Sequence, residues 1–588
     1  MAAIALRGRL TRVRRRLPLR AGPGVGVGAV IILLLVLPVG AFLILAFSPQ
    51  LFGQPGGWFD VSHSFGQALQ GGVLTGLVDS VVISALTAVL SLAIGLGIAW
   101  YTTRSTLFGS RYWPFLIWAV LMAPSYLVAL GWESLLGKDG AFWDLGLQIP
   151  SLTNLFFAPP GVLVVYVLKG VPFAYLAVSW GMAALGGEFE DAARIHGAGR
   201  LRTWRVLLPM IAPAMWSGMA IVFAETISDF GVAHTLAASS NFPLATQVMY
   251  NFLDDFPTQF SAAAAVSWFV IAAAGGAMLL QSRALRGRVY GVLSGRTRQP
   301  IRTPLNTRGQ ALGLTLVGGY FLLALGVPVL GAVIGSLLSS TGPGHSTWTL
   351  SWYQGLLQNR YAVEDSESLP GPLSFSTLNA VIAATAVAVI AIPLAMYLTR
   401  PRGGISARTV DLLLLGTVAL PGIVLGAGYI FTYNLPFLGD IGLVLYGTAP
   451  LLAMAYIAGA LPNATRVMMG PVAQVDQAPV SAARVHGAGP VGALRHSLLP
   501  VVSRSLVWAW VYVFTGVLFE LPVSQLLYPP NSPTLSVSIN RLLGDVFYGP
   551  ATTMSVAAVV YALLVVALVL GAFRLLAPRG WRQIGRSG

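Results

Sequence analysis

The sequence predicts an all-α membrane protein that crosses the bilayer many times. Of its 588 residues, 56% are hydrophobic and only 9% are charged, and the mean hydropathy is +0.75. A soluble domain contains about 25% charged residues, so this composition excludes a soluble globular fold. The apolar residues also gather in runs long enough to cross a hydrocarbon layer about 30 Å thick.

Twelve such apolar runs are predicted to be membrane-spanning helices. They lie at about 23–47, 76–102, 113–136, 158–184, 210–236, 262–282, 310–337, 374–399, 410–434, 444–468, 501–527 and 551–575. The first run is too long for a removable signal peptide and lacks a small-residue cleavage site. We therefore expect it to be the first span of the bundle.

The basic residues predict the orientation, because Lys and Arg concentrate on the cytoplasmic side of a membrane protein. With the arginine cluster between Arg7 and Arg20 in the cytoplasm, 31 basic residues lie inside. Three lie outside, namely Lys138, Arg360 and Arg541. Both termini are expected in the cytoplasm of a bacterial cell, with the chain in the inner membrane. The net charge of +15 therefore reflects topology and not nucleic-acid binding.

The chain is predicted to be a tandem duplication of one unit of six spans. "KGVPFAY" at 169–175 corresponds to "GALPNAT" at 459–465, and "APSYLVALGW" at 123–132 corresponds to "LPGIVLGAGY" at 420–429. Because an even number of spans restores sidedness, both units have the same orientation and form a parallel repeat. We assign 1–300 to the first half, with a basic N-terminal tail, and 301–588 to the second, joined by a linker at 283–309.

A charged stretch occurs twice on the cytoplasmic side, between spans four and five of each half. It reads "EFEDAARIHGAGRLRTWRVLLP" at 188–209 and "SAARVHGAGPVGALRHSLLP" at 481–500. Helix formers followed by Gly197 predict a short helix that stops at a positive dihedral, then a second segment ending at Leu-Leu-Pro. A solvated loop would explain one copy. Two copies at matched positions favour a docking site for two identical partners.

At these residues the chain resembles the permease subunits of ATP-binding-cassette importers. Their cytoplasmic loop contains Glu-Ala-Ala, three residues, then Gly, and later a hydrophobic residue before Leu-Pro. In that family the alanines let the helix seat in a groove of the ATPase, and Gly permits the turn. The resemblance implies coupling roles for Asp191, Ala192, Ala193, Gly197, Ser481, Ala482, Ala483 and Gly487. Because Ser481 replaces the acidic residue, the two docking contacts are expected to be unequal.

The chain itself is not expected to be an enzyme. It has no Gly-rich phosphate loop ending in Lys-Ser or Lys-Thr, no Cys, and no cluster of metal ligands at helical spacing. The resemblance implies two separate ATPase subunits that carry ATP and Mg. It also implies a periplasmic substrate-binding protein, which would dock on outer loops including 48–75, 237–261 and 338–373.

Acidic residues inside predicted spans are functional candidates, because a charge at a helix centre costs about 2.5–3.5 kcal/mol on insertion scales. Glu225 and Asp229 are four residues apart and share a helix face. Asp229 aligns with Glu520, and the following Gly231 and Pro522 predict a broken or terminating helix in both halves.

Two interpretations of the aligned acids stay open. Asp229 and Glu520 line the path of a cationic substrate, or each caps a helix break or pairs with Lys169. Glu225 is a third pathway candidate, although a structural role is favoured because it aligns with Gly516. Lys169 aligns with Gly459 and is expected to be a structural partner.

The "SDFG" and "ELP" stretches, with both halves in one chain, look most like the ferric-iron branch of these importers. Thiamine, polyamine and aminophosphonate permeases are near relatives. The predicted function is import by alternating access of a solute, above all ferric iron, that a binding protein delivers. The alternative from another class is a secondary transporter that uses Asp229, Glu520 and Lys169 as an ion relay. That alternative leaves the repeated loop without a role.

Overall fold

The computed structural model is helical, which confirms the all-α class, and contains no β-strand in the part of the chain that it describes. Its described residues are 30–53, 55–70, 72–185, 188–197, 199–285, 302–358, 360, 369–399, 405–418, 420–475, 482, 483, 485–487, 489, 492, 494–544 and 548–576. The arginine cluster at the N-terminus and most of the linker lie outside these residues.

The first half contains the elements up to α13. They are η1 (Ile32–Val36), α2 (Leu37–Ile44), η2 (Pro49–Phe52), α3 (Val61–Ala68), α4 (Gly72–Thr103), α5 (Trp113–Met122), α6 (Ser125–Leu136), α7 (Ala141–Asp144), α8 (Pro150–Phe156), α9 (Pro159–Ala184), α10 (Glu188–Ile195), α11 (Arg200–Ser228), η3 (Ala233–Ala237), α12 (Ala245–Asp254) and α13 (Phe260–Leu285).

The second half contains the elements from α14 onward. They are α14 (Thr307–Phe321), η4 (Leu322–Gly326), α15 (Val327–Leu337), α16 (Ser351–Leu357), α17 (Pro370–Leu398), α18 (Ile405–Val418), α19 (Gly422–Tyr433), α20 (Pro436–Asp440), α21 (Ala449–Ala473), η5 (Leu494–Leu498), α24 (Leu499–Leu518), α25 (Pro522–Leu527), α26 (Leu535–Gly544) and α27 (Tyr548–Leu576).

Every predicted span contains helix, but the predicted count of twelve is not confirmed. Among the described residues, eight helices are long and apolar enough to cross a membrane, or nine if α5 and the segment Ser125–Asp144, which contains α6 and α7, form one bent span. That pair bends by 94° at Ala123 and Pro124, because the residue before a proline is disfavoured in the helical region. The apolar helices Ile32–Ile44 and Gly422–Tyr433 are shorter.

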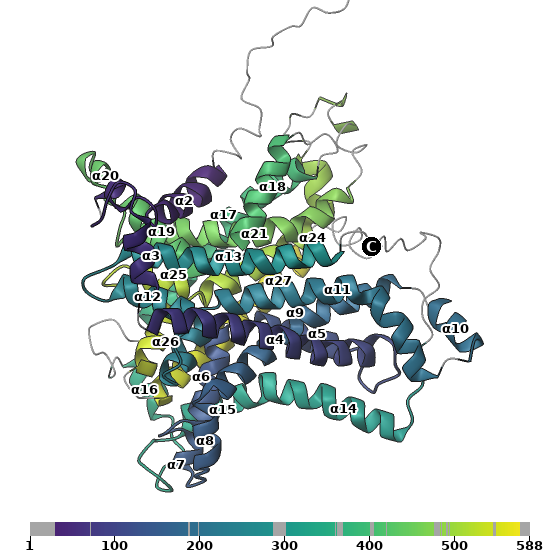
Figure 1. The fold of residues 1–588 in the computed structure, drawn as a ribbon. Helices are drawn as coiled ribbons and strands as arrows, with labels where there is room; N and C mark the ends of the chain where they lie inside the picture. The colour runs from purple at the N-terminus through teal and green to yellow at the C-terminus, as the bar shows by residue number, and fades with distance from the viewer. Residues whose placement is uncertain are drawn as a thin grey trace, which may run out of the picture.

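The long helices run between two ends of the bundle (Figure 1). One end carries α10, and the opposite end carries α3, α12, α16 and α26. We call these the loop end and the outer end. Interrupted spans connect the two ends, because α11 stops at Ser228 and α24 stops at Leu518. The predicted breaks at Asp229 and before Pro522 are therefore confirmed.

The two halves exchange their first helices, because α2 packs on α19 and α15 packs on α6 (Figure 1). Glycine permits both contacts. A Cβ at Gly131 would overlap the Pro328 carbonyl oxygen, and a Cβ at Gly428 would lie 2.7 Å from the Pro38 carbonyl oxygen. The first helix of each half thus approaches a glycine of the other half closely, and the two contacts hold the halves together. The division at residues 300 and 301 stays a prediction.

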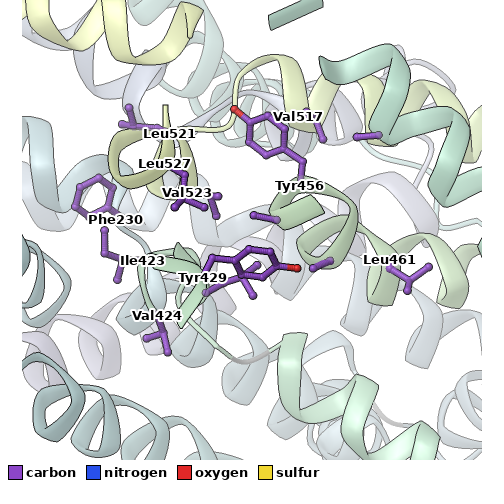
Figure 2. Close-up of a cluster of buried hydrophobic side chains, with 14 of the residues drawn as sticks. Phe230, Ile423, Val424, Tyr429, Tyr456, Leu461, Val517, Leu521, Val523 and Leu527 are labelled. Carbon is purple, nitrogen blue, oxygen red and sulfur yellow. The ribbon is translucent and has the colours of Figure 1, made fainter. Parts of the chain in front are cut away.

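A single buried apolar cluster continues across the two halves. Figure 2 shows Phe230, which follows α11, beside Ile423 of α19 and close to Leu527 of α25. Tyr429 is fully buried in the same cluster, and its hydroxyl donates to the Leu34 carbonyl oxygen at 2.9 Å. This shared core fixes the interrupted helices of one half against the other.

Candidate coupling loops and central cavity

The first repeated loop is a short helix, a glycine turn and a long helix. In α10, the Ala192 carbonyl accepts from the His196 amide at 3.1 Å, and Gly197 then turns the chain with φ +72°. Ala192 is exposed and Ala193 is half-buried. Asp191 lies in α10. A Cβ at Gly197 would have nothing within 4 Å, so the backbone dihedral and not space favours glycine here.

The second repeated loop has the same local geometry. The Ala482 carbonyl accepts from the His486 amide at 3.0 Å, and Gly487 has φ +85°. Ala482 is exposed and Ala483 is half-buried, as in the first copy. The predicted coupling residue Ser481 lies outside the described residues. The glycine turn predicted from the sequence is therefore present in both copies.

One detail of the predicted hairpin is wrong. No separate segment ends at Leu208 and Pro209, because α11 begins at Arg200 and continues through Pro209 to Ser228. Proline removes one backbone donor from a helix, but a helix that is packed on its neighbours tolerates that loss. The turn at Gly197 therefore joins α10 directly to a membrane-spanning helix.

Sequence reasoning missed two exposed aliphatic residues, Ile195 and Val485. They occupy the same position in the two copies and are 83% and 84% exposed. An apolar side chain this exposed at the end of a short helix is a candidate contact for a partner. The signal was present in the sequence, since both copies place an aliphatic residue two positions before the turn glycine.

The three predicted pathway acids line one cavity between the halves. The cavity has a volume of about 520 Å³ and is lined by Glu225, Asp229 and Glu520 together with polar and apolar side chains. Its polar lining includes Ser125, Tyr126, Asn463, Tyr512 and Thr515. Acids 291 residues apart in the sequence thus face a common space.

Asp229 and Glu520 both cap the helix that follows the break. Asp229 Oδ1 accepts from the Val232 amide at 2.8 Å, and Oδ2 accepts from Ser125 Oγ at 2.6 Å. Glu520 Oε1 accepts from the Val523 amide at 2.8 Å, and Oε2 accepts from the Ser524 amide at 2.9 Å. Carboxylates stabilise the first turn of a helix through its free amides and its dipole. The capping interpretation is confirmed, and both acids also line the cavity.

Glu225 differs from the other two acids. It is exposed to the cavity and caps no helix break. Its aligned residue Gly516 also borders the cavity, and a Cβ there would have nothing within 4 Å. The cavity therefore has an additional acid on one side and open space at the corresponding position on the other.

Lys169 binds a helix end and not an acid. Its Nζ donates to the Val120 carbonyl at 2.8 Å and also to the Ala123 carbonyl, where α5 ends. The two ion pairs among the described residues, Arg104–Glu190 and Arg466–Asp411, do not include it. Within the described residues no salt bridge therefore joins Lys169 to a pathway carboxylate, and its direct contacts are structural ones at the end of α5.

At the outer end, two hydrogen bonds join the halves. Asn540 Nδ2 donates to His234 Nε2 at 2.9 Å, and Gln525 Nε2 donates to Tyr250 Oη at 3.2 Å. His234 and Gln525 each lie five residues after the capping acids Asp229 and Glu520. Tyr250 and Asn540 are each the sixth residue of α12 and α26, so the two bonds are equivalent under the repeat. We call them the outer seam. Both lie beyond the helix breaks, while the cavity is lined by the segments that lead to the loop end.

Comparison with known proteins also relates this chain to transport permeases. Residues 91–287 match the family described as "Binding-protein-dependent transport system inner membrane component", and this stretch includes the first loop, Glu225 and Asp229. The chain is similar to the "Ferric transport system permease protein FbpB" of Actinobacillus pleuropneumoniae, with 21% identity over 82% of this chain and 69% of the relative.

Two further relatives differ in coverage and in named solute. The "Fe(3+)-transport system permease protein FbpB 2" of Haemophilus influenzae is 21% identical over 83% of this chain and 87% of its own. The "Probable sulfate transport system permease protein cysT" of Helicosporidium is 26% identical over 30% of this chain and 63% of its own. Since the duplicated loops, the helical membrane fold and the matched segment agree, the chain belongs to the permease subunits of ATP-binding-cassette importers.

Proposed function

We propose that this chain is the permease of an ATP-driven importer of ferric iron. The observation that carries the proposal is the lining of the central cavity, which has three carboxylates and, within the described residues, no Lys or Arg. Carboxylate oxygens bind hard cations well, and they are a poor environment for an oxyanion such as sulfate. Three of the relatives that align with most of this chain are named as ferric or Fe(3+) transport permeases.

The geometry of the acids is suited to the passage of a cation through the cavity and not to tight binding of a metal ion. No group of three or more His, Cys, Asp or Glu among the described residues converges to hold a metal ion. Asp229 and Glu520 already accept backbone hydrogen bonds, although each oxygen retains acceptor capacity. A cation would therefore meet successive weak contacts, which allow it to leave the cavity as well as enter it.

The repeated loops are the proposed docking sites for two ATPase subunits, which carry ATP and Mg. Each copy presents an exposed alanine, an exposed aliphatic residue and a glycine turn in the same geometry. A periplasmic binding protein docks at the outer end, and both termini lie in the cytoplasm. Closure of the ATPases draws the loops together and opens the outer seam, which is a rigid-body switch between two states.

The alternatives to ferric import differ in what they require of the cavity residues. A polyamine is also a cation, so the acids alone do not separate it from iron. The ion-relay alternative requires Lys169 to exchange protons or ions with the acids, but its ammonium is held by backbone carbonyls. The secondary transporter is therefore disfavoured by the same geometry that supports import.

The ligand of the binding protein that co-purifies with this permease tests the solute. We expect elemental analysis to find iron at about one atom per binding protein, and mass spectrometry to find no organic cation. A binding protein that carries sulfate, molybdate, thiamine or a polyamine would refute ferric import while leaving the importer assignment in place.

A further inference from the structure

A buried ion pair connects the first loop to the body of its half. Arg104 directly follows α4, and its Nη1 lies 3.0 Å from Glu190 Oε1 in α10. Arg104 is 4% exposed and Glu190 is 8% exposed. Sequence reasoning counted Arg104 only as one of many cytoplasmic positive charges, because nothing local in the sequence relates it to a residue 86 positions later.

The same guanidinium also holds the end of α9. Arg104 Nη2 donates to the Leu185 carbonyl at 2.7 Å and to the Met182 carbonyl. A basic residue at a helix C-terminus satisfies free carbonyls and complements the helix dipole. Arginine can do this while it binds a carboxylate, because its planar group carries five donors in a fixed arrangement. One side chain therefore fixes α4, α9 and α10 relative to one another.

The ion pair is an important contact of α10 outside its own loop. Apart from this pair, α10 packs chiefly on α11, to which the glycine turn joins it. A turn with a glycine at its centre resists rotation weakly, whereas a salt bridge buried away from solvent resists it more strongly, because breaking it leaves buried charges unpaired. The orientation of α10 against α4 and α9 thus depends on Glu190.

The second copy offers no equivalent acid. Val480 aligns with Glu190, and residues 478–481 contain no acid, whereas residues 188–191 contain three. The nearest acid in the second copy is Asp476, which aligns with Gly186 before the helix. Ile195 and Val485 are equally exposed, so both copies present the same kind of side chain, whereas the sequence of the second copy lacks the acid that pairs with Arg104 in the first.

We propose that Arg104 and Glu190 are positioning residues that anchor the first coupling loop to α4 and α9. Motion of the docked ATPase then reaches the first half through a rigid link. The second loop, with Val480 at the corresponding position, transmits the same motion through its continuation into η5 and α24. The anchor itself rests on geometry, and its role in transmission rests on the proposed function.

Spin labels test the anchor without any partner protein. The chain has no Cys, so I195C and V485C each place one label at matched and equally exposed positions, in full-length permease in lipid nanodiscs. We expect E190Q to increase the rotational mobility of the label at 195 at least twofold and to leave the label at 485 unchanged. Unchanged mobility at 195, or an equal increase at both positions, would overturn the anchor.

Transport stoichiometry tests the transmission role. In the complete complex, we expect E190Q to lower the iron imported per ATP hydrolysed several-fold, with ATP hydrolysis maintained, and E190D to restore most of the loss. The matched control is D411N, because the pair of Asp411 with Arg466 spans 3.9 Å and both side chains are partly exposed, at 42% and 38%.

The outcomes separate this inference from the proposed function. Wild-type stoichiometry in E190Q, or the same loss in D411N, would refute transmission through the anchor. If the wild-type complex imported no iron with ATP, the proposed function would fail, while the label at 195 would still decide whether the anchor exists.

Discussion

The two halves share one scaffold but differ in the charges attached to it. The helix caps and the loop turns occur in both halves. Asp229 and Glu520 cap equivalent helices, and Gly197 and Gly487 form equivalent turns. Other charges are confined to the first half, which has acids or a lysine where the second has Gly516, Gly459 and Val480. The repeat therefore preserves the helix breaks and the glycine turns, whereas the charged residues at these three positions differ between the halves.

The Lys169 position illustrates the consequence of this divergence. In the first half the ammonium satisfies the carbonyls at the end of α5. In the second half, Gly459 borders a cavity of about 270 Å³. A side chain thus supports the break in the first half, whereas a glycine beside a cavity stands at the corresponding position in the second. Equivalent substitutions should therefore have unequal effects.

Both halves contain the helix exchange, and disrupting it should cause the largest loss of stability. We expect G131V or G428V to destabilise the protein by about 3 kcal/mol, since added bulk in a tight contact costs up to that amount. The measurement is the SDS fraction at which half of the detergent-solubilised protein unfolds. G318A is the control, because a Cβ there would have nothing within 4 Å. Equal stability of all three would show that the close approach is unimportant.

The second-largest effect is expected at Lys169, where equivalent substitutions in the two halves should differ in their effect on stability. K169M leaves two carbonyls near the centre of the protein without their donor, and an unsatisfied buried polar group costs about 1–3 kcal/mol. The same SDS titration measures the loss. G459A in the second half should change stability little, because its Cβ would face only a Leu425 side-chain atom at 3.3 Å. A K169M protein as stable as wild type would mean that the capping contact contributes nothing.

The glycine turns should behave alike in the two loops. A valine in the left-handed region costs roughly 1–2 kcal/mol, so we expect G197V and G487V each to distort its loop. Iron uptake in the double variant should fall well below that in either single variant while ATP hydrolysis continues. Parallel uptake and ATPase assays on reconstituted complexes measure this uncoupling. Normal uptake in the double variant would remove the coupling role.

The smallest expected effect concerns the exposed pair of Asp411 and Arg466. Surface ion pairs contribute about 0–1 kcal/mol, so D411N should shift the SDS titration barely measurably. A loss comparable to that of K169M would show that the second half depends on its own ion pair, and the contrast between the halves would disappear.

Local signals predicted the parts of this fold that local chemistry determines. The helical class followed from the apolar runs, the breaks from Gly231 and Pro522, and the turn from Gly197. The predicted count of twelve spans is not confirmed among the described residues. The predicted end of the hairpin at Pro209 was wrong, because packing decides whether a helix continues past a proline. The exchanged helices, the outer seam and the Arg104–Glu190 pair join residues far apart, and no periodicity identifies such partners.

Uptake of radioactive ferric iron by proteoliposomes tests the central claim most directly. The vesicles contain the permease with its ATPase subunits, ATP is enclosed in the lumen, and the iron-loaded binding protein is added outside. We predict uptake that requires enclosed ATP, persists with a proton ionophore and falls at least tenfold in D229N, which retains a capping side chain. Uptake that needs no ATP and collapses with the ionophore would contradict an ATP-driven importer.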